Sequence, residues 1–131
     1  MSSVLRHITF DCADAWTLGE FWKQVTGYVD DPANPNEPGD EEYLIVPPQG
    51  GPGFLFVPVP EGKVVKNRVH SCLSPDDRTR DEEVERLLAV GATVYEDHRK
   101  PDGAGWVTLL DPEGNEFCIL RSAAKREGRP E

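Results

Sequence analysis

A carboxylate and a thiol stand two residues apart near the end of the sequence, in the stretch DPEGNEFCIL at residues 111–120. Asp, Pro and Gly at its first, second and fourth positions are typical of a type I turn, and apolar runs enter and leave it. The stretch therefore predicts a β-hairpin whose second strand carries Glu116 and Cys118. Alternate residues of a strand point to the same face, so these two side chains are expected to point the same way.

Two histidines occupy matching places in a chain that looks duplicated. Each half shows the pattern of a strand, a helix, a short strand, a loop and a hairpin. His7 opens the first strand of one half and His70 lies at the matching place in the other, a period of about 63 residues. Since duplicated units usually form one binding surface, this arrangement predicts that the two imidazoles converge.

The strands that carry the histidines place other polar side chains on the same faces. Thr9 shares the face of His7, and Arg68 and Cys72 share the face of His70, so these three side chains are candidates for binding a substrate. An inward arginine can bind a carboxylate or a phosphate through two hydrogen bonds. The alternative interpretation of Arg68 is a residue at a strand end that reaches solvent.

The remaining pattern supplies the elements that must position these groups. One helix is expected at 14–26 and another from a capping box at Ser74–Asp77 to a stop at Gly91. In the first strand, Ile8 and Phe10 are expected in the core. The expected strands are residues 4–12, 28–30, 43–46, 54–57, 66–73, 92–97, 106–110 and 116–120.

Length, charge and cysteine count bound the class of protein. A chain of 131 residues suits a single domain, and three cysteines without a CxxC spacing argue against a disulfide framework or a zinc finger. The formal charge of −10 argues against nucleic acid as a partner. It permits a cationic ligand, with a solubilising surface as the alternative. The sequence shows no signal peptide and no run long enough to span a membrane, so we expect a cytoplasmic protein without a membrane partner.

The motifs HITFDCAD, NRVHSCL and DPEGNEFCIL, in this order and with a helix after each of the first two, resemble the vicinal oxygen chelate superfamily. Within it, the chain is similar to small glyoxalase-like and bleomycin-resistance-like bacterial proteins. The resemblance implies an α+β fold of two βαβββ modules, residues 4–60 and 66–122, that together form an eight-stranded open cleft. Residues 123–131 are expected to be a polar tail.

The resemblance also implies a metal site. The family's histidine ligands match His7 and His70. Its acidic ligand lies seven residues after the Asp of the turn; in this chain that position is Cys118, and the nearby Glu116 lies two residues too early. A fourth ligand would lie in residues 44–60, which contain no Asp, Glu, His or Cys. Two His and one Cys suit a divalent ion such as zinc better than magnesium or calcium. Glu116 could substitute as a ligand or act as a general base, with a solvated strand end as its other interpretation.

Further side chains are candidates for the walls and rim of the cleft. His98, in a loop rich in glycine and charge, could be a mobile acid or base, or plain loop surface. Phe54, Phe56 and Trp106 could form apolar walls of a substrate pocket, or could simply pack.

The sequence is therefore compatible with two functions. The first is a metal-dependent lyase or isomerase for a small oxygenated metabolite, in which Arg68 orients an anionic group. The alternative is a metal-free protein of the bleomycin-resistance type that binds or sequesters a small molecule, and no metal cofactor is then expected. A homodimer is common among the proteins that the chain resembles, although no residue specifies one.

Overall fold

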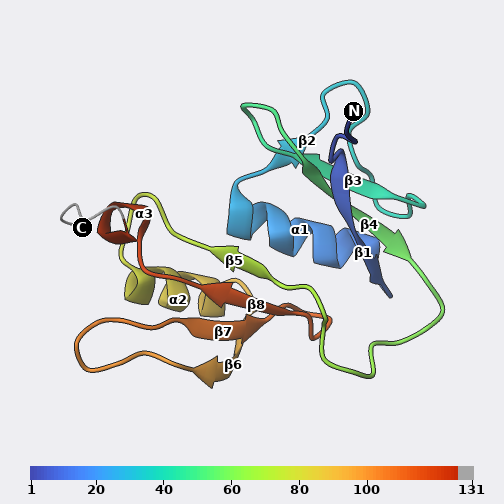
Figure 1. Ribbon diagram of the computed structural model, residues 1–131. Helices are drawn as coiled ribbons and strands as arrows, with labels where there is room; N and C mark the ends of the chain where they lie inside the picture. Colours follow the sequence, from blue (N-terminus) through green and yellow to red (C-terminus); the bar gives the residue numbers. More distant parts are fainter. Residues whose placement is uncertain (127–131) are drawn as a thin grey trace. The chain divides into compact units, whose positions relative to one another are not determined.

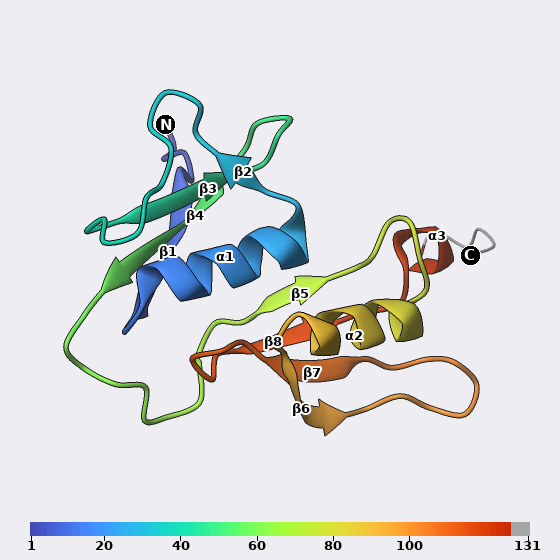
Figure 2. The same ribbon diagram turned by 180° about the vertical axis from the view of Figure 1, so that it is seen from behind.

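The structure is a computed structural model that describes residues 1–126, and the part of the predicted tail beyond Arg126 lies outside the described residues. The chain divides into two compact units, Met1–Val64 and a second unit that begins at Val65. Each unit contains one four-stranded sheet, and a helix follows the first of its strands, so the elements run βαβββ along the chain (Figure 1; seen from behind in Figure 2). The predicted α+β class with two modules is confirmed. Within residues 1–126, none of the helices has the length and apolar character that a membrane crossing requires.

The elements of unit 1 match the predicted ones closely. Helix α1 begins where the Asp14 carboxylate accepts a hydrogen bond from the Thr17 backbone N–H at 3.1 Å. It ends at Gly27, which adopts a φ of 73° that an L-residue rarely takes. The sheet has the order β1-β4-β3-β2, with β1 parallel to β4. Unit 1 comprises β1 (His7–Cys12), α1 (Ala15–Thr26), β2 (Val29–Asp30), β3 (Tyr43–Val46) and β4 (Gly53–Pro58).

Aromatic rings fill the space between α1 and the sheet. The ring of Phe10 lies 5.4 Å from that of Trp22, 5.2 Å from Phe54 and 5.0 Å from Phe56, measured between centroids. Pairs at such separations add to the free energy that burial itself contributes. The prediction for Phe10 is borne out in part, because its ring contacts three core rings while the residue itself is half-buried. The prediction for Ile8 is wrong, because this residue is 41% exposed. Alternation fixes the face of a residue but not how far the helix covers that face.

Unit 2 repeats this topology, with the sheet order β5-β8-β7-β6 and β5 parallel to β8. The predicted hairpin is confirmed, because the Gly114 N–H donates to the Asp111 carbonyl at 2.9 Å and the Asp111 carboxylate accepts from the N–H groups of Glu113 and Asn115. The expected strand at 66–73 is shorter, three residues long. Unit 2 comprises β5 (Ser71–Leu73), α2 (Arg80–Ala89), β6 (Thr93–Asp97), β7 (Val107–Leu110), β8 (Glu116–Ile119) and α3 (Ala123–Arg126).

The start of α2 differs from the predicted one. The capping box lies at Thr79 and Glu82: the Thr79 hydroxyl accepts from the Glu82 N–H at 3.1 Å, and the Glu82 carboxylate accepts from the Thr79 N–H at 2.9 Å. Of the expected box at Ser74–Asp77, Asp77 pairs with Arg78 instead. The capping-box pattern requires Glu or Gln at its fourth position, which Thr79–Glu82 has, whereas Ser74–Asp77 carries Asp there; the strict pattern therefore favours the observed start.

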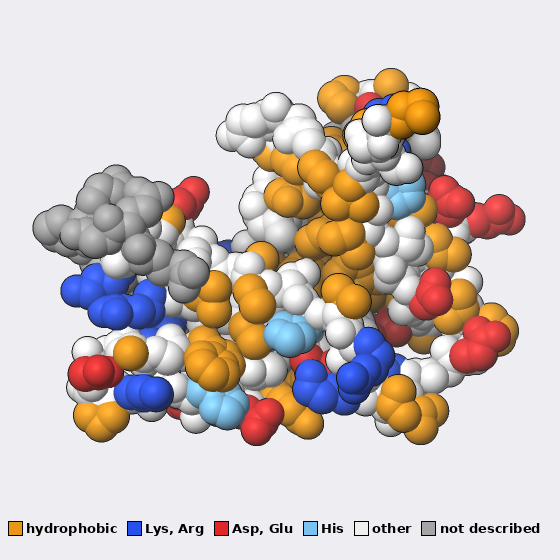
Figure 3. Space-filling model, viewed as in Figure 1, with side chains coloured by type: hydrophobic (Ala, Val, Ile, Leu, Met, Phe, Trp, Pro, Cys, Tyr) orange, Lys and Arg blue, Asp and Glu red, His pale blue; other side chains and the backbone are white. Residues whose placement is uncertain are grey.

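Hydrophobic side chains also reach the surface of both units. Strand β6 is exposed along its whole length, and β1 is exposed at four of its six residues. One face of the molecule is drawn in Figure 3, where hydrophobic side chains are orange. Large exposed hydrophobic residues include Leu5, Ile8, Val64, Val65, Val69, Val94, Tyr95 and Trp106.

Candidate functional site

One imidazole and two thiols lie together in unit 2. The donor atoms of His70, Cys72 and Cys118 are all within 4.8 Å of one another. Two of the three predicted metal ligands, His70 and Cys118, are therefore brought together, and Cys72 joins them although it was expected among the substrate-binding residues. Donor atoms at these separations could hold one divalent ion, because Zn–S and Zn–N bonds are about 2.3 and 2.0 Å long.

The strand register of unit 2 explains this convergence. Cys72 and Cys118 are paired Cα partners on the parallel strands β5 and β8, so their side chains stand beside each other on one face of the sheet. His70 lies one residue before β5, and one of its ring nitrogens lies within 4.8 Å of both sulfurs. Cys118 is 5% exposed, whereas His70 and Cys72 are exposed, so the cluster has a buried inner side and an open outer side.

A neighbouring hydroxyl contacts the inner thiol. Thr108, the Cα partner of Cys118 on β7, places its Oγ1 3.4 Å from the Cys118 Sγ. A hydrogen bond of this kind orients a sulfur ligand, much as outer partners orient histidine ligands.

Glu116 shares the face of Cys118, but its carboxylate is bound by the backbone of Asn67. It is buried, and its Oε2 accepts a hydrogen bond from the Asn67 backbone N–H at 3.0 Å. The Asn67 side chain also donates to the Asn115 side chain at 3.2 Å. This contact ties the start of unit 2 to β8, and the predicted role of Glu116 as ligand or general base stays a prediction.

The predicted site residues of unit 1 lie in two different environments. His7 and Thr9 are exposed on β1, so neither is committed to the core. Phe54 and Phe56 belong to the aromatic core, and packing within unit 1 accounts for their burial. The convergence of His7 with residues of unit 2, and the role of the two phenylalanines as pocket walls, stay predictions.

His98 and Trp106, which were predicted separately, form a pair. Their rings stack with centroids 4.7 Å apart, and the His98 backbone N–H donates to the Trp106 carbonyl at 2.9 Å. The His98 Nε2 also lies 3.7 Å from a Glu96 carboxylate oxygen, where a protonated imidazole would form an ion pair.

Arg68 is exposed in the segment before β5.

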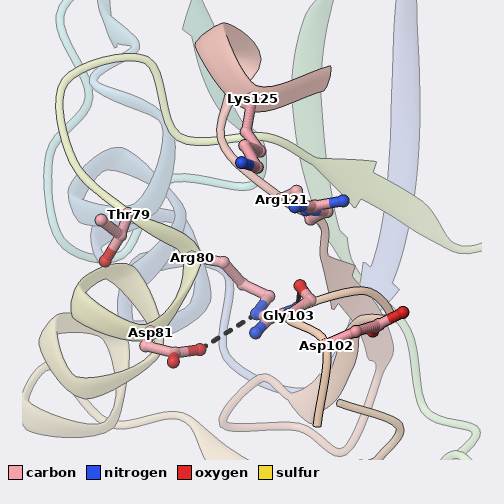
Figure 4. A pocket seen from close by; sticks show the side chains of 7 residues that line it. All are labelled: Thr79, Arg80, Asp81, Asp102, Gly103, Arg121 and Lys125. Atoms are coloured by element: carbon pink, nitrogen blue, oxygen red, sulfur yellow. Dashed lines mark hydrogen bonds and ion pairs between the residues drawn. The ribbon is translucent and has the colours of Figure 1, made fainter. Parts of the chain in front are cut away.

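A separate hollow of about 260 Å³ lies at the start of α2 (Figure 4). Arg80 crosses it and donates through Nη1 to the carbonyls of Gly103, Ala104 and Gly105 at 3.0 to 3.1 Å. Its Nε also pairs with Asp81 at 3.0 Å. The guanidinium thus holds the loop before β7 against α2. None of the predicted site residues lines this hollow, and we assign it a structural role.

An exposed ion pair lies beside this loop. Arg99 donates to Asp97 at 2.7 Å and to Asp81 at 3.2 Å. The hydrogen bonds from Arg99 lower the pKa of the Asp97 carboxyl to about 2. The pair joins the end of β6 to the first turn of α2.

Sequence reasoning missed two contacts of the site. Asn67 approaches Glu116 from a part of the chain that is distant in sequence, so no local pattern identifies it. Thr108 lies ten residues before Cys118 in the predicted hairpin, and the register of that hairpin could have identified it. For Cys72 a signal was present, because it follows His70 by two residues in the strand expected at 66–73. Only the register of β5 against β8 shows that Cys118 lies beside them.

The comparisons with known proteins agree with this fold. The sequence profile of the glyoxalase-like domain family matches residues 7–120, so the chain belongs to this family, a branch of the vicinal oxygen chelate superfamily. No curated protein sequence matches the chain.

Several solved structures share the fold. The fosfomycin resistance protein FosX from Mesorhizobium loti superimposes with a TM-score of 0.68 at 16% identity, covering 98% of this chain and 100% of that chain. A mutant FosX from Listeria monocytogenes, in complex with Mn(II) and 1S,2S-dihydroxypropylphosphonic acid, gives 0.70 at 18% identity over 97% and 99%. A glyoxalase/bleomycin resistance protein/dioxygenase family enzyme from Burkholderia phytofirmans PsJN gives 0.65 at 20% identity over 89% and 97%. At these identities the likeness shows a common fold.

Proposed function

We propose that this glyoxalase-like chain is a metal-dependent enzyme of the lyase or isomerase type that acts on a small oxygenated metabolite. The observation that supports this function most is the approach of His70 and Cys118 in unit 2, whose donor atoms lie within 4.8 Å of each other. FosX from Listeria monocytogenes was solved with a divalent ion and a small oxygenated phosphonic acid. We extend that combination of ion and ligand to this chain.

The donor set decides which ions fit. Sulfur and imidazole nitrogen favour zinc or another soft divalent ion, whereas magnesium and manganese prefer oxygen ligands. The family resemblance implies His7 of unit 1 as a further ligand, and the proposed function does not depend on it. When bound, such an ion supplies Lewis acidity that polarises an oxygen of the substrate.

The chain's own side chains then have separate tasks. Arg68, exposed before β5, binds an anionic group of the substrate through two hydrogen bonds. Glu116, with one carboxylate oxygen held by Asn67, accepts a proton from the substrate. His98, backed by the indole ring of Trp106, is the second proposed acid or base.

Metal analysis tests this proposal directly. Protein purified without an affinity tag or chelator is expected to contain about one divalent transition-metal ion per chain, and His70→Ala is expected to lose it. His98→Ala is the matched control, since it removes an imidazole of the same unit from outside the cluster. If the wild-type protein binds no transition metal under reducing conditions, the proposal is wrong.

A metal-free binding protein is the second candidate function. It is favoured by the burial of Cys118 and its contact with the Thr108 hydroxyl, because a buried cysteine often acts as a small hydrophobic side chain. A thermal-shift screen of cationic and anionic metabolites, run with and without chelator, separates the two. Stabilisation by a small molecule that chelator leaves unchanged would favour the binding protein. The homodimer expected from the family stays a prediction.

A further inference from the structure

The two units carry different side chains at positions that their topology makes equivalent. In unit 2, Cys72 pairs with Cys118 across the parallel strands β5 and β8. In unit 1, the equivalent parallel pair is Thr9 and Leu55 across β1 and β4. A histidine lies two residues before the first member of each pair. Unit 2 thus offers three potential ligands of a soft metal where unit 1 offers one.

We infer that Cys72 is a metal ligand and that unit 2 alone holds a soft divalent ion, zinc in type, through His70, Cys72 and Cys118. The inference rests on the ion of the proposed function, but it replaces His7 in the ligand set. Two sulfurs and one imidazole nitrogen are a donor set found in catalytic zinc sites. Two thiolates also neutralise the charge of a divalent ion without any carboxylate.

Exposure supports the role of Cys72. Cysteine is among the most often buried residues, and on the strand opposite, Cys118 follows that rule at 5% exposure. Cys72 is exposed, yet its sulfur lies within 4.8 Å of both the Cys118 sulfur and a His70 nitrogen. An ion between these groups would have a buried thiolate on one side and solvent on the other. The exposed side leaves a fourth coordination position for water or a ligand.

The backbone supplies the preorganisation that the site needs. Neighbouring strands lie about 4.8 Å apart, so two cysteines in direct register reach one ion without bending either strand. Strand β8 is buried at each of its four residues, which fixes Cys118 within the sheet. The contact of the Thr108 hydroxyl with its sulfur adds an outer partner.

Four variants test the ligand set under reducing conditions, so that the two thiols are not closed into a disulfide. Zinc stoichiometry and affinity are measured for Cys72→Ser, Cys12→Ser, His70→Ala and His7→Ala. Cys72→Ser and His70→Ala are expected to weaken zinc binding by more than the ~10–100-fold that loss of an outer-shell partner costs. Cys12→Ser changes a cysteine outside the cluster, and His7→Ala changes the equivalent histidine of unit 1. Both are expected to bind zinc as the wild type does.

Cobalt substitution gives a second readout that does not depend on activity. The sulfur-to-cobalt charge-transfer absorption of the Co(II) protein scales with the number of thiolate ligands. It is expected to fall by about half in Cys72→Ser, which keeps one of two thiolates. Circular dichroism of Cys72→Ser verifies that this variant remains folded.

The outcomes separate this inference from the proposed function. If His7→Ala loses zinc, whether or not Cys72→Ser does, the claim that unit 2 suffices is overturned, while a metal-dependent enzyme stands. If Cys72→Ser retains wild-type zinc affinity and the full cobalt absorption, the role of Cys72 is overturned. If zinc binds as inferred but its removal leaves small-molecule binding and turnover unchanged, the inference stands and the proposed function falls.

Discussion

The two units have one topology but are filled in different ways. Unit 1 is packed by rings, and unit 2 is packed mainly by aliphatic side chains, with Phe117 as its fully buried aromatic residue among those described. The largest fully buried side chains of unit 1 are Trp22, Tyr43, Phe56, Leu18 and Ile45, and those of unit 2 are Phe117, Leu87, Leu109, Ile119, Val84 and Val107. The same βαβββ frame therefore accepts either kind of core.

The units also differ in what they offer for chemistry. The pair at the centre of the parallel strands is Thr9 and Leu55 in one unit, and Cys72 and Cys118 in the other. Since the frame is common to both, chemistry depends on which side chains occupy a few register positions and not on the fold. The comparison predicts that core changes in unit 1 and metal binding in unit 2 are separable.

The largest expected effect comes from emptying the aromatic core of unit 1. Trp22→Ala removes a ring that is 1% exposed and contacts Phe10, Phe21 and Phe54. The free energy of unfolding is expected to fall by about 3–5 kcal/mol, measured by urea denaturation. Zinc stoichiometry at temperatures where the variant is folded should not change. A folded variant that no longer binds zinc would break the proposed separation of the two units.

A smaller loss of stability is expected in unit 2, when the arginine that holds the loop before β7 against α2 is removed. Arg80→Ala leaves the carbonyls of Gly103, Ala104 and Gly105 without their donor, and it should lower the free energy of unfolding by about 2–3 kcal/mol. Arg78→Ala is the control, since this arginine pairs near the surface and its loss should cost under ~1 kcal/mol. Equal effects of the two changes would show that Arg80 does not hold the loop.

The helix starts of the two units should respond alike. Thr79→Ala removes the cap of α2 and Asp14→Ala that of α1, each at an expected cost of about 1 kcal/mol in thermal or urea unfolding. Thr79→Ser keeps a hydroxyl and should restore most of the loss. If Thr79→Ala had no effect while Ser74→Ala destabilised the protein, the capping box would lie where the sequence first placed it.

Local patterns in the sequence predicted the helices, strands and turns, and the resemblance to a known family supplied the fold of two βαβββ modules. The caps of α1 and the turn at Asp111 consist of neighbouring residues whose side chains satisfy nearby backbone groups, so the pattern identifies them. The start of α2 was misplaced because the prediction accepted Asp77 as the closing residue of a capping box, whereas Thr79–Glu82 carries the Glu that the pattern prefers. This error lies in how the local pattern was interpreted, since the pattern itself contains the observed start.

The site was predicted in part, for a related reason. Alternation grouped Cys72 with His70, and their donor atoms do lie close together, although β5 begins only at Ser71 and His70 precedes it. The approach of Cys118 depends on the pairing of strands that lie more than forty residues apart in sequence, and only the resemblance to a known family pointed to it. The family resemblance gave His7 as the third ligand, whereas the register of β5 against β8 supports our proposal that Cys72 takes that place.

The smallest effect at neutral pH, and the sharpest test of the core of unit 1, concerns Tyr43. Its hydroxyl is buried and has no partner in hydrogen-bond geometry among the described residues, and the Lys23 ammonium only offsets part of the effect of burial on its pKa. Tyr43→Phe should therefore change the free energy of unfolding by less than about 1 kcal/mol at neutral pH. Burial raises the pKa of Tyr43 to about 12, against an ordinary value of 10.0. The unfolded chain therefore ionises first, and the contribution of Tyr43 to stability is complete below pH 10 and is lost as the pH rises through about 12. Urea unfolding at about pH 8 and about pH 11 should show wild-type protein losing more stability than Tyr43→Phe, while Tyr28→Phe, a control in the same unit, follows the wild type. Equal losses in wild type and Tyr43→Phe would mean that the hydroxyl is open to solvent and that the ring core of unit 1 is looser than its contacts indicate.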